Sequence, residues 1–142
     1  MLISTKGRYA LRVMADLAGR QTRQYVPLRD LALAQDISEK YLEAIIKLLV
    51  NAQLLSGLRG KGGGYRLTRP PEGYTVGEIL RATEDSLAPV SCLDREALPC
   101  ARSANCPTRP IWQGLEDAID QYLDGVTLAE LVRPDGDGGS KG

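Results

Sequence analysis

The sequence predicts a mainly α-helical fold with one small β-hairpin. Apolar residues recur with helical spacing in three segments of the N-terminal half and in one long segment near the C-terminus. A glycine-rich run between two short apolar segments indicates the hairpin. The chain has 142 residues, of which 43% are hydrophobic and 25% charged. These values are typical of one compact soluble domain with appendages.

Three helices are expected in the first third of the chain. The first covers residues 5–18, with a serine or threonine placed to cap its start, and the second covers residues 28–34. Ser38 is placed to cap a third helix over residues 39–51. We expect this third helix to bury one apolar stripe: Tyr41, Leu42, Ile45, Leu48 and Leu49.

The second and third helices are separated only by residues 35–37. A turn of this length is typical of a helix-turn-helix, whose second helix can lie in the DNA major groove. Strands are expected next over residues 54–56 and 65–67, around a tip at residues 59–64 where glycines permit positive φ. A basic hairpin directly after a helix-turn-helix is a wing, so the elements predict a winged helix-turn-helix.

The C-terminal half is expected to contain two further helices and a cysteine-bearing segment. Thr75 and Glu78 have the spacing of a capping box for a helix that ends near residue 83. Residues 84–107 lack any helical period and hold all three cysteines. A long helix is expected over residues 108–123, with one apolar stripe: Ile111, Leu115, Ile119 and Tyr122. A small domain would struggle to cover this stripe alone, which favours a homodimer.

This pattern divides the chain into four regions. Residues 1–83 are expected to form the winged helix-turn-helix domain, and residues 84–107 the cysteine-bearing loop. Residues 108–132 are expected to form a dimerisation helix followed by a capped turn. The composition of residues 133–142 is typical of a disordered tail.

The net charge of zero is divided unevenly along the chain. Residues 1–69 contain 12 Lys or Arg and 5 Asp or Glu, whereas residues 70–142 contain 6 and 13. A front half with a charge of +7 favours a polyanionic partner such as nucleic acid, because Lys and Arg displace counterions from phosphates. The alternative is two solvated surfaces that attract each other.

The composition disfavours several classes of protein. Histidine is absent, which removes the commonest general base and the nucleophile pairs that depend on it, so most classes of hydrolase are disfavoured. No apolar run could span a bilayer, and residues 1–14 lack the apolar region of a secretory signal. We therefore expect a cytoplasmic protein with no membrane partner. Three cysteines, an odd number, disfavour a disulfide framework.

The polar face of the third helix has the chemistry to read bases. Lys40 and Lys47 could bind phosphate or guanine, and Glu43 could accept a hydrogen bond from a cytosine amino group. The alternative is a surface ion pair between Glu43 and Lys47, which have the favoured i, i+4 order. In the hairpin tip, a basic residue such as Arg59 could enter a narrow minor groove. A phosphate-cradling nucleotide loop and an ordinary flexible turn are the alternatives for this tip.

The cysteines Cys92, Cys100 and Cys106 are separated by seven and then five residues. Thiolates in an irregular loop suit an iron–sulfur cluster or zinc. Zinc sites usually pair their cysteines at closer spacing, and either site normally takes four protein ligands. Unligated thiols, including thiols that sense oxidation, are the third alternative.

Several separate motifs, in the same order, resemble the Rrf-two family of winged-helix transcription regulators. They are LISTKGRYA at residues 2–10, ISEKYLEAII at residues 37–46, RGKGGGYRL at residues 59–67, the three-cysteine loop, and Trp112 near the start of the last long helix. The similarity covers about residues 1–132.

The resemblance implies a homodimer that crosses over through its long C-terminal helix, with two heads that read a partly palindromic operator in double-stranded DNA. It implies that DNA contacts are made by the following residues: Ser38, Lys40, Tyr41, Glu43, Arg59 and Gly60. To these we add Lys47 and Lys61, from the same helix face and the same hairpin tip. The resemblance assigns Cys92, Cys100 and Cys106 to an iron–sulfur cluster.

The sequence departs from the family pattern at the fourth cluster ligand. Arg109 occupies the position of a histidine found in some members, and Arg8 lies near the position of an aspartate found in others. Neither arginine can bind iron, because guanidinium has no free lone pair. An external thiol and a carboxylate of the other subunit are candidates, together with these residues of the chain: Glu84, Asp85, Ser91, Asp94 and Glu96.

We therefore expect a cytoplasmic, homodimeric DNA-binding regulator with a repressor role and no enzymatic activity. Its three cysteines would hold an iron–sulfur cluster that senses iron–sulfur, redox or nitric oxide status. The alternative is a cluster-free regulator of cysteine or sulfur metabolism, controlled by a metabolic enzyme, by another partner protein or by thiol oxidation.

Overall fold

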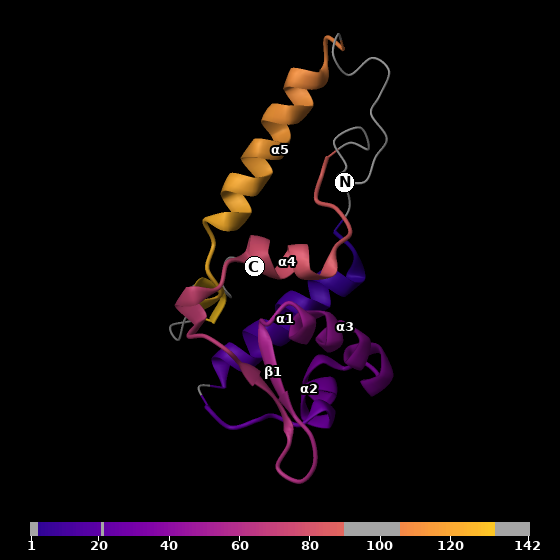
Figure 1. Ribbon diagram of the computed structural model, residues 1–142, viewed down its shortest axis with the longest axis vertical. Helices are drawn as coiled ribbons and strands as arrows, with labels where there is room; N and C mark the ends of the chain where they lie inside the picture. Colours follow the sequence, from indigo (N-terminus) through magenta and orange to yellow (C-terminus); the bar gives the residue numbers. More distant parts are fainter. Residues whose placement is uncertain (1–2, 21, 90–105, 133–142) are drawn as a thin grey trace.

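The computed structural model describes residues 3–20, 22–89 and 106–132. It contains a helical head with a hairpin at one end and a long helix, α5, that projects from the other end (Figure 1). In chain order the elements are α1 (Thr5–Gly19), α2 (Leu28–Gln35), α3 (Glu39–Asn51), β1 (Leu55–Leu58), β2 (Gly64–Leu67), η1 (Pro71–Gly73), α4 (Val76–Thr83), α5 (Arg109–Asp124) and η3 (Leu128–Val132). The predicted winged helix-turn-helix class is confirmed.

The predicted helix starts and the helix-turn-helix turn are confirmed. The Ser4 hydroxyl caps α1 by accepting a 3.1 Å hydrogen bond from the Gly7 N–H. The Ser38 hydroxyl caps α3 in the same way, accepting from the Tyr41 N–H at 3.1 Å. Between them, Asp36 ends α2 in the left-handed conformation with φ 55°, which reverses the chain towards α3.

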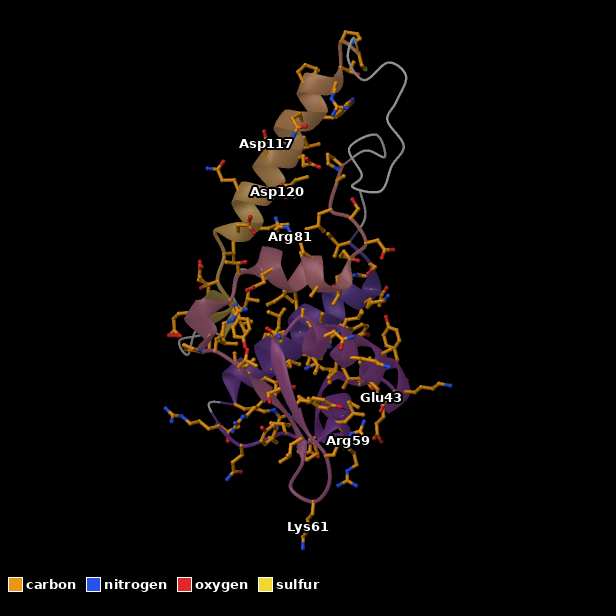
Figure 2. The ribbon with its side chains drawn as sticks, in the orientation of Figure 1. Glu43, Arg59, Lys61, Arg81, Asp117 and Asp120 are labelled. Atoms are coloured by element: carbon orange, nitrogen blue, oxygen red, sulfur yellow. The ribbon has the colours of Figure 1, made fainter. Side chains whose placement is uncertain are left out.

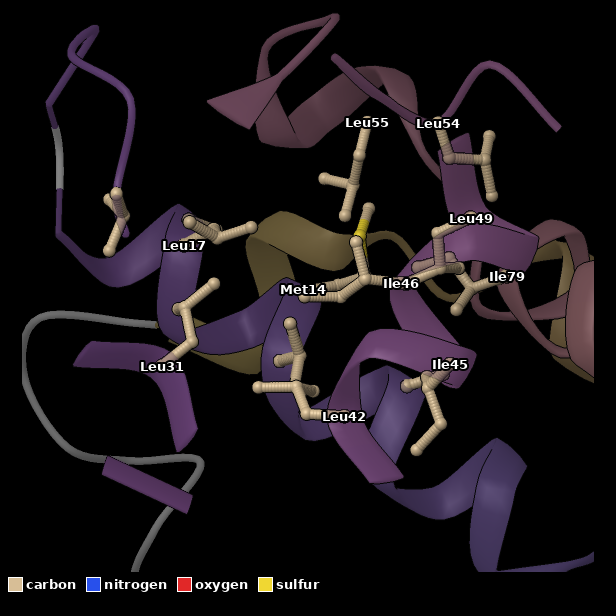
Figure 3. Close-up of a cluster of buried hydrophobic side chains, with 14 of the residues drawn as sticks. Met14, Leu17, Leu31, Leu42, Ile45, Ile46, Leu49, Leu54, Leu55 and Ile79 are labelled. Atoms are coloured by element: carbon tan, nitrogen blue, oxygen red, sulfur yellow. The ribbon is translucent and has the colours of Figure 1, made fainter. Parts of the chain in front are cut away.

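One hydrophobic core joins the three N-terminal helices, the hairpin and α4 (Figure 3). Its labelled members are Met14, Leu17, Leu31, Leu42, Ile45, Ile46, Leu49, Leu54, Leu55 and Ile79. The predicted buried stripe of α3 was partly wrong, because Ile46 is buried whereas Leu48 is only half-buried. Tyr41 is 37% exposed, since it lies in the first turn of α3 at the rim of the core.

The hairpin is longer than predicted, and an isolated β-bridge joins it to the segment before α2. Gly64 pairs with Leu58 and so belongs to β2 rather than to the tip, while Leu54 lies before β1. On the other side of β2, Tyr65 exchanges two 2.9 Å backbone hydrogen bonds with Val26. The segment that precedes α2 is therefore tied to the hairpin.

The chain returns to the head after α5. The Val76 N–H donates to the Val126 carbonyl at 2.9 Å, and the Leu128 N–H donates to the Tyr74 carbonyl at 3.0 Å. Leu128 is fully buried in the core that includes α1. The start of α4 and the segment after α5 are thus held side by side, which fixes where α5 leaves the head.

The hydroxyl of Tyr74 organises the base of the hairpin. It donates to the Leu54 carbonyl at 2.8 Å and accepts from the backbone N–H groups of Thr68 at 2.8 Å and Arg69 at 3.1 Å. The whole side chain is buried, with 0% exposure. One phenol therefore satisfies backbone groups that flank both strands.

We predict that Tyr74→Phe destabilises the head by about 1–3 kcal/mol, because it removes the hydroxyl that bonds the Leu54 carbonyl and the Thr68 and Arg69 N–H groups. Tyr41→Phe is the matched control, since that side chain is 37% exposed, its hydroxyl bonds no described residue, and the change should alter stability little. Urea unfolding followed by circular dichroism measures both. Equal unfolding midpoints for the two variants would contradict the role assigned to Tyr74.

Candidate nucleic-acid interface

The polar face of α3 is exposed and forms no ion pair with any residue that the structure describes. Lys40, Glu43 and Lys47 are all exposed, and the expected alternative, an ion pair between Glu43 and Lys47, is not formed. Ser38 uses its hydroxyl oxygen as a cap acceptor, so its O–H remains available as a donor. This face therefore offers donors and one carboxylate acceptor to a ligand.

The tip of the hairpin presents two basic side chains. Gly60 and Gly62 adopt φ 92° and 78°, and the Gly63 N–H donates to the Gly60 carbonyl at 3.0 Å to close the turn. Arg59 and Lys61 are exposed, and neither forms an ion pair with a described residue. Figure 2 shows both at the end of the molecule opposite to α5, where Glu43 also lies.

A polar network that the sequence analysis missed joins α1 to the helix-turn-helix. The Gln35 side chain accepts from Arg12 Nε at 2.9 Å and donates to Asp16 Oδ2 at 3.0 Å. Arg12 also lies 4.8 Å from the centre of the Tyr9 ring, which meets Tyr41 of α3 edge to face at 6.0 Å. The i, i+4 spacing of Arg12 and Asp16 on a polar face of α1 was the only sequence signal of this network.

The long helix α5 is exposed or half-buried along its length, and Ile119 of the predicted stripe is half-buried where this helix lies near Ile3 and Leu80. No residue of α5 is buried, and Ile111, Leu115 and Tyr122 of the predicted apolar stripe are 63%, 44% and 71% exposed. Such a stripe on a helix that leaves the head is an unpartnered surface.

An arginine of α4 anchors the C-terminal end of α5. Arg81 reaches Asp124 at 2.6 Å and Asp120 at 3.1 Å. The bond to Asp124 is the largest cause that raises the pKa of Arg81 above its ordinary value; burial opposes this rise, and the bond to Asp120 adds to it. Gly77 makes room for this contact, since a Cβ there would overlap the Asp124 carboxylate.

Of the three cysteines, Cys106 lies within the described residues, whereas Cys92 and Cys100 lie outside them. Cys106 precedes α5, with Sγ 3.3 Å from Thr108 Oγ1. Hydrogen bonds from the side chain and then the backbone of Thr108 lower the pKa of the Cys106 thiol, and Arg109 adds a smaller effect. The thiolate is the form in which cysteine binds iron or zinc, but the described residues contain no group of three or more Cys, Asp or Glu side chains placed to hold a metal ion.

Among the candidate fourth ligands, Glu84 is already engaged. Its two carboxylate oxygens accept hydrogen bonds from the Ser4 N–H at 2.6 Å and the Ser4 hydroxyl at 2.7 Å. Gly7 permits this approach, since a Cβ there would overlap the carboxylate. Asp85 is exposed, and the remaining candidates, Ser91, Asp94 and Glu96, lie outside the described residues.

The family model of Rrf2, described as an iron-dependent transcriptional regulator, matches residues 3–134. The chain belongs to the Rrf2 (Rrf-two) family. The predicted resemblance is thereby confirmed, and members of this family are transcription regulators rather than enzymes.

Curated relatives and solved structures agree with this membership. The chain is 37% identical over 132 residues to the HTH-type transcriptional regulator IscR of Aliivibrio salmonicida, covering 93% of this chain and 77% of the relative. It is 39% identical over 133 residues to protein rrf2 of Nitratidesulfovibrio vulgaris, covering 94% and 88%. It is similar to the structure of CymR, the global cysteine regulator of B. subtilis, at 36% identity and a TM-score of 0.75, covering 93% and 96%. The structure of T. potens IscR matches at 34% identity and a TM-score of 0.72, covering 93% and 86%.

No helix within the described residues is long and apolar enough to cross a membrane.

The wing geometry yields a prediction about two glycines. Gly64 adopts φ 145°, and a Cβ there would overlap the Val26 carbonyl, whereas Gly60 adopts φ 92° with open space around it. We expect Gly64→Ala to cost about 2–4 kcal/mol, because strain and overlap add, and Gly60→Ala to cost about 1 kcal/mol from backbone strain alone. Thermal unfolding compares them, and an equal loss in both variants would contradict the close approach of Val26.

Proposed function

We propose that this Rrf2-family regulator is a cytoplasmic homodimer that binds a specific operator in double-stranded DNA and acts as a repressor. The observation that carries this proposal is that the polar face of α3 and the wing tip lie exposed and unpaired at the end of the head opposite to α5. The residues proposed to contact DNA are Ser38, Lys40, Tyr41, Glu43, Lys47, Arg59, Gly60 and Lys61.

Each part of this surface has a distinct task. With α3 in the major groove, Glu43 accepts from a cytosine amino group, and Lys40 and Lys47 donate to guanine or phosphate. Arg59 enters the adjacent minor groove, where a narrow groove concentrates negative potential. Gly60 lets the wing backbone approach the DNA closely, because its positive φ and missing side chain keep the tip slim.

The DNA-binding proposal predicts affinity that falls steeply with salt for duplexes selected from a random pool. Arg59→Ala should weaken binding to the selected duplex by about 1–3 kcal/mol. Arg59→Lys is the matched control, since it keeps the charge and should retain the salt dependence while losing part of the sequence preference. Fluorescence anisotropy with labelled duplexes measures both. Failure to select any duplex, or binding that is insensitive to salt, would rule out the proposal.

The exposed stripe of α5 is the proposed dimer seam, where a second copy of the helix would cover Ile111, Leu115, Ile119 and Tyr122. Leu115→Lys should place a charge in this seam and give monomers. Leu33→Lys makes the same substitution on the exposed surface of α2 and should leave the dimer intact. Light scattering distinguishes dimers from monomers at a protein concentration of tens of micromolar, which suits dimers with dissociation constants of about that size. The proposed seam would be contradicted if the wild type were monomeric, or if Leu115→Lys were dimeric like Leu33→Lys.

We further propose that Cys92, Cys100 and Cys106 hold an iron–sulfur cluster through which the protein senses iron–sulfur, redox or nitric oxide status. The lowered pKa of Cys106 supports thiolate ligation. When bound, the cluster supplies an iron centre open to oxygen or nitric oxide. The chain offers a physical connection to the head, because Glu84, at the start of the cysteine-bearing segment, is bonded to the first turn of α1. A change in that segment can thus bias the spacing of the two heads.

Each single Cys→Ala variant should lose iron and visible absorbance together after anaerobic reconstitution with iron and sulfide, because no spare cysteine exists. Thr108→Val keeps all three thiols and should retain iron. Operator affinity is then measured before and after nitric oxide treatment. If iron never binds the wild type, or if its removal leaves operator affinity and preference unchanged, the sensor proposal is wrong.

If the sensor proposal is wrong, the cluster-free alternative is favoured. In this alternative, the protein regulates cysteine or sulfur metabolism and is controlled by a metabolic enzyme, by another partner protein or by thiol oxidation. The similarity to CymR supports this alternative, as does the lowered pKa of Cys106, which favours a reactive thiolate.

A further inference from the structure

A basic groove lies along one flank of the wing, between the hairpin and the segment that leads into α2. We define it by Arg23, Ser56, Arg66, Thr68 and Arg69, which come from that segment, from both strands and from the chain after β2. In Figure 1 the C-terminal end of α1, which also lines the groove, lies on the side of the hairpin away from α3. The groove is therefore separate from the surface assigned above to base reading.

Two of the three arginines that line this groove lack a compensating acid. None of the described residues that line it is Asp or Glu. Arg69 is neutralised by Glu78, which it grips with two bonds of 2.7 and 2.9 Å. Arg23 and Arg66 are exposed and form no ion pair with any residue that the structure describes. Two unpaired guanidinium groups remain.

Arg66 is held in place before any ligand arrives. Its Nη1 donates to the Arg23 carbonyl at 3.0 Å, and its guanidinium lies 4.4 Å from the centre of the Tyr25 ring. Ser56, directly across the hairpin from Arg66, lies 3.5 Å from the Tyr25 hydroxyl through its Oγ. The Arg23 carbonyl uses one edge of the guanidinium, which leaves its other N–H groups available to an anion. Because the side chain is already held in place, binding an anion there would cost little side-chain entropy.

We propose that the basic groove binds backbone phosphates of the DNA that flanks the half-site, an inference that rests on the DNA-binding function proposed above. If α3 occupies a major groove and the wing tip the adjacent minor groove, the duplex continues past the wing on the side away from α3. The groove lies on that flank, and the hairpin carries positive charge from Lys61 and Arg59 at the tip to Arg66 near the base. Phosphate contacts there add affinity without adding sequence preference.

The test compares two duplexes with the same selected operator, one trimmed to its edges and one extended by about one helical turn on each side. For the wild type, the extended duplex should bind about three- to tenfold more tightly, with a salt slope steeper by roughly 0.9 for each added phosphate contact. The double variant Arg23→Gln, Arg66→Gln should lose both gains and retain its affinity for the trimmed duplex. Arg66→Lys should keep part of the gain because it keeps the charge.

Lys61→Gln is the matched control, since it removes one positive charge from the tip of the same hairpin. It should weaken binding to both duplexes by the same factor and leave the gain from the flanks unchanged. Circular dichroism spectra and unfolding midpoints establish that every variant is folded.

The outcomes separate this inference from the proposed function. If the wild type binds no duplex, the DNA-binding function itself fails. If it binds the operator but gains nothing from the flanks, or if the double variant keeps the gain, the groove is not a phosphate contact and the proposed function stands. If millimolar inorganic phosphate abolishes the gain while sodium chloride of equal ionic strength does not, the groove is a small-anion site and the inference is also overturned.

Discussion

The buried hydroxyl of Tyr74 is the interaction on which the arrangement of this molecule depends most. Its three hydrogen bonds to Leu54, Thr68 and Arg69 hold the base of the wing against the core. The backbone carbonyl of the same residue accepts from Leu128, which anchors the chain that returns from α5. The wing and the segment after the long helix therefore meet at one buried residue.

Charge is distributed so that one end of the molecule stays positive. Among the described residues, a single ion pair, between Arg69 and Glu78, joins the basic front half to the acidic second half. Direct ion pairing between the two halves is thus limited, among the described residues, to this one contact. The acidic residues Asp120 and Asp124 instead bind Arg81 within the second half, where they set the direction of α5. The basic residues of the wing are left for a ligand.

The cysteine-bearing segment leaves the head beside the start of α1. Glu84 occupies the N-terminal end of this helix, where unpaired N–H groups and the helix dipole favour a carboxylate. Tyr9, one turn further along α1, contacts Tyr41 of α3. The first turns of α1 therefore contact both the end of α4, through Ser4 and Glu84, and the surface proposed to read bases, through Tyr9 and Tyr41.

The sequence by itself determined the elements, their order and the winged helix-turn-helix class, because these depend on local signals. Apolar spacing places the helices, Ser4 and Ser38 cap two of them, and glycines mark the wing. Only the tertiary structure decided contacts between residues distant in the chain, such as Gly64 against Val26 and Glu84 against Ser4.

The tertiary structure also decided which residues with a favourable local spacing make the expected contact. Glu43 and Lys47 have the spacing of an ion pair and do not make one, whereas Tyr41 has the spacing of a core residue and stays partly exposed. Helical periodicity states which residues share a face, but burial depends on what packs against that face and where its edge falls.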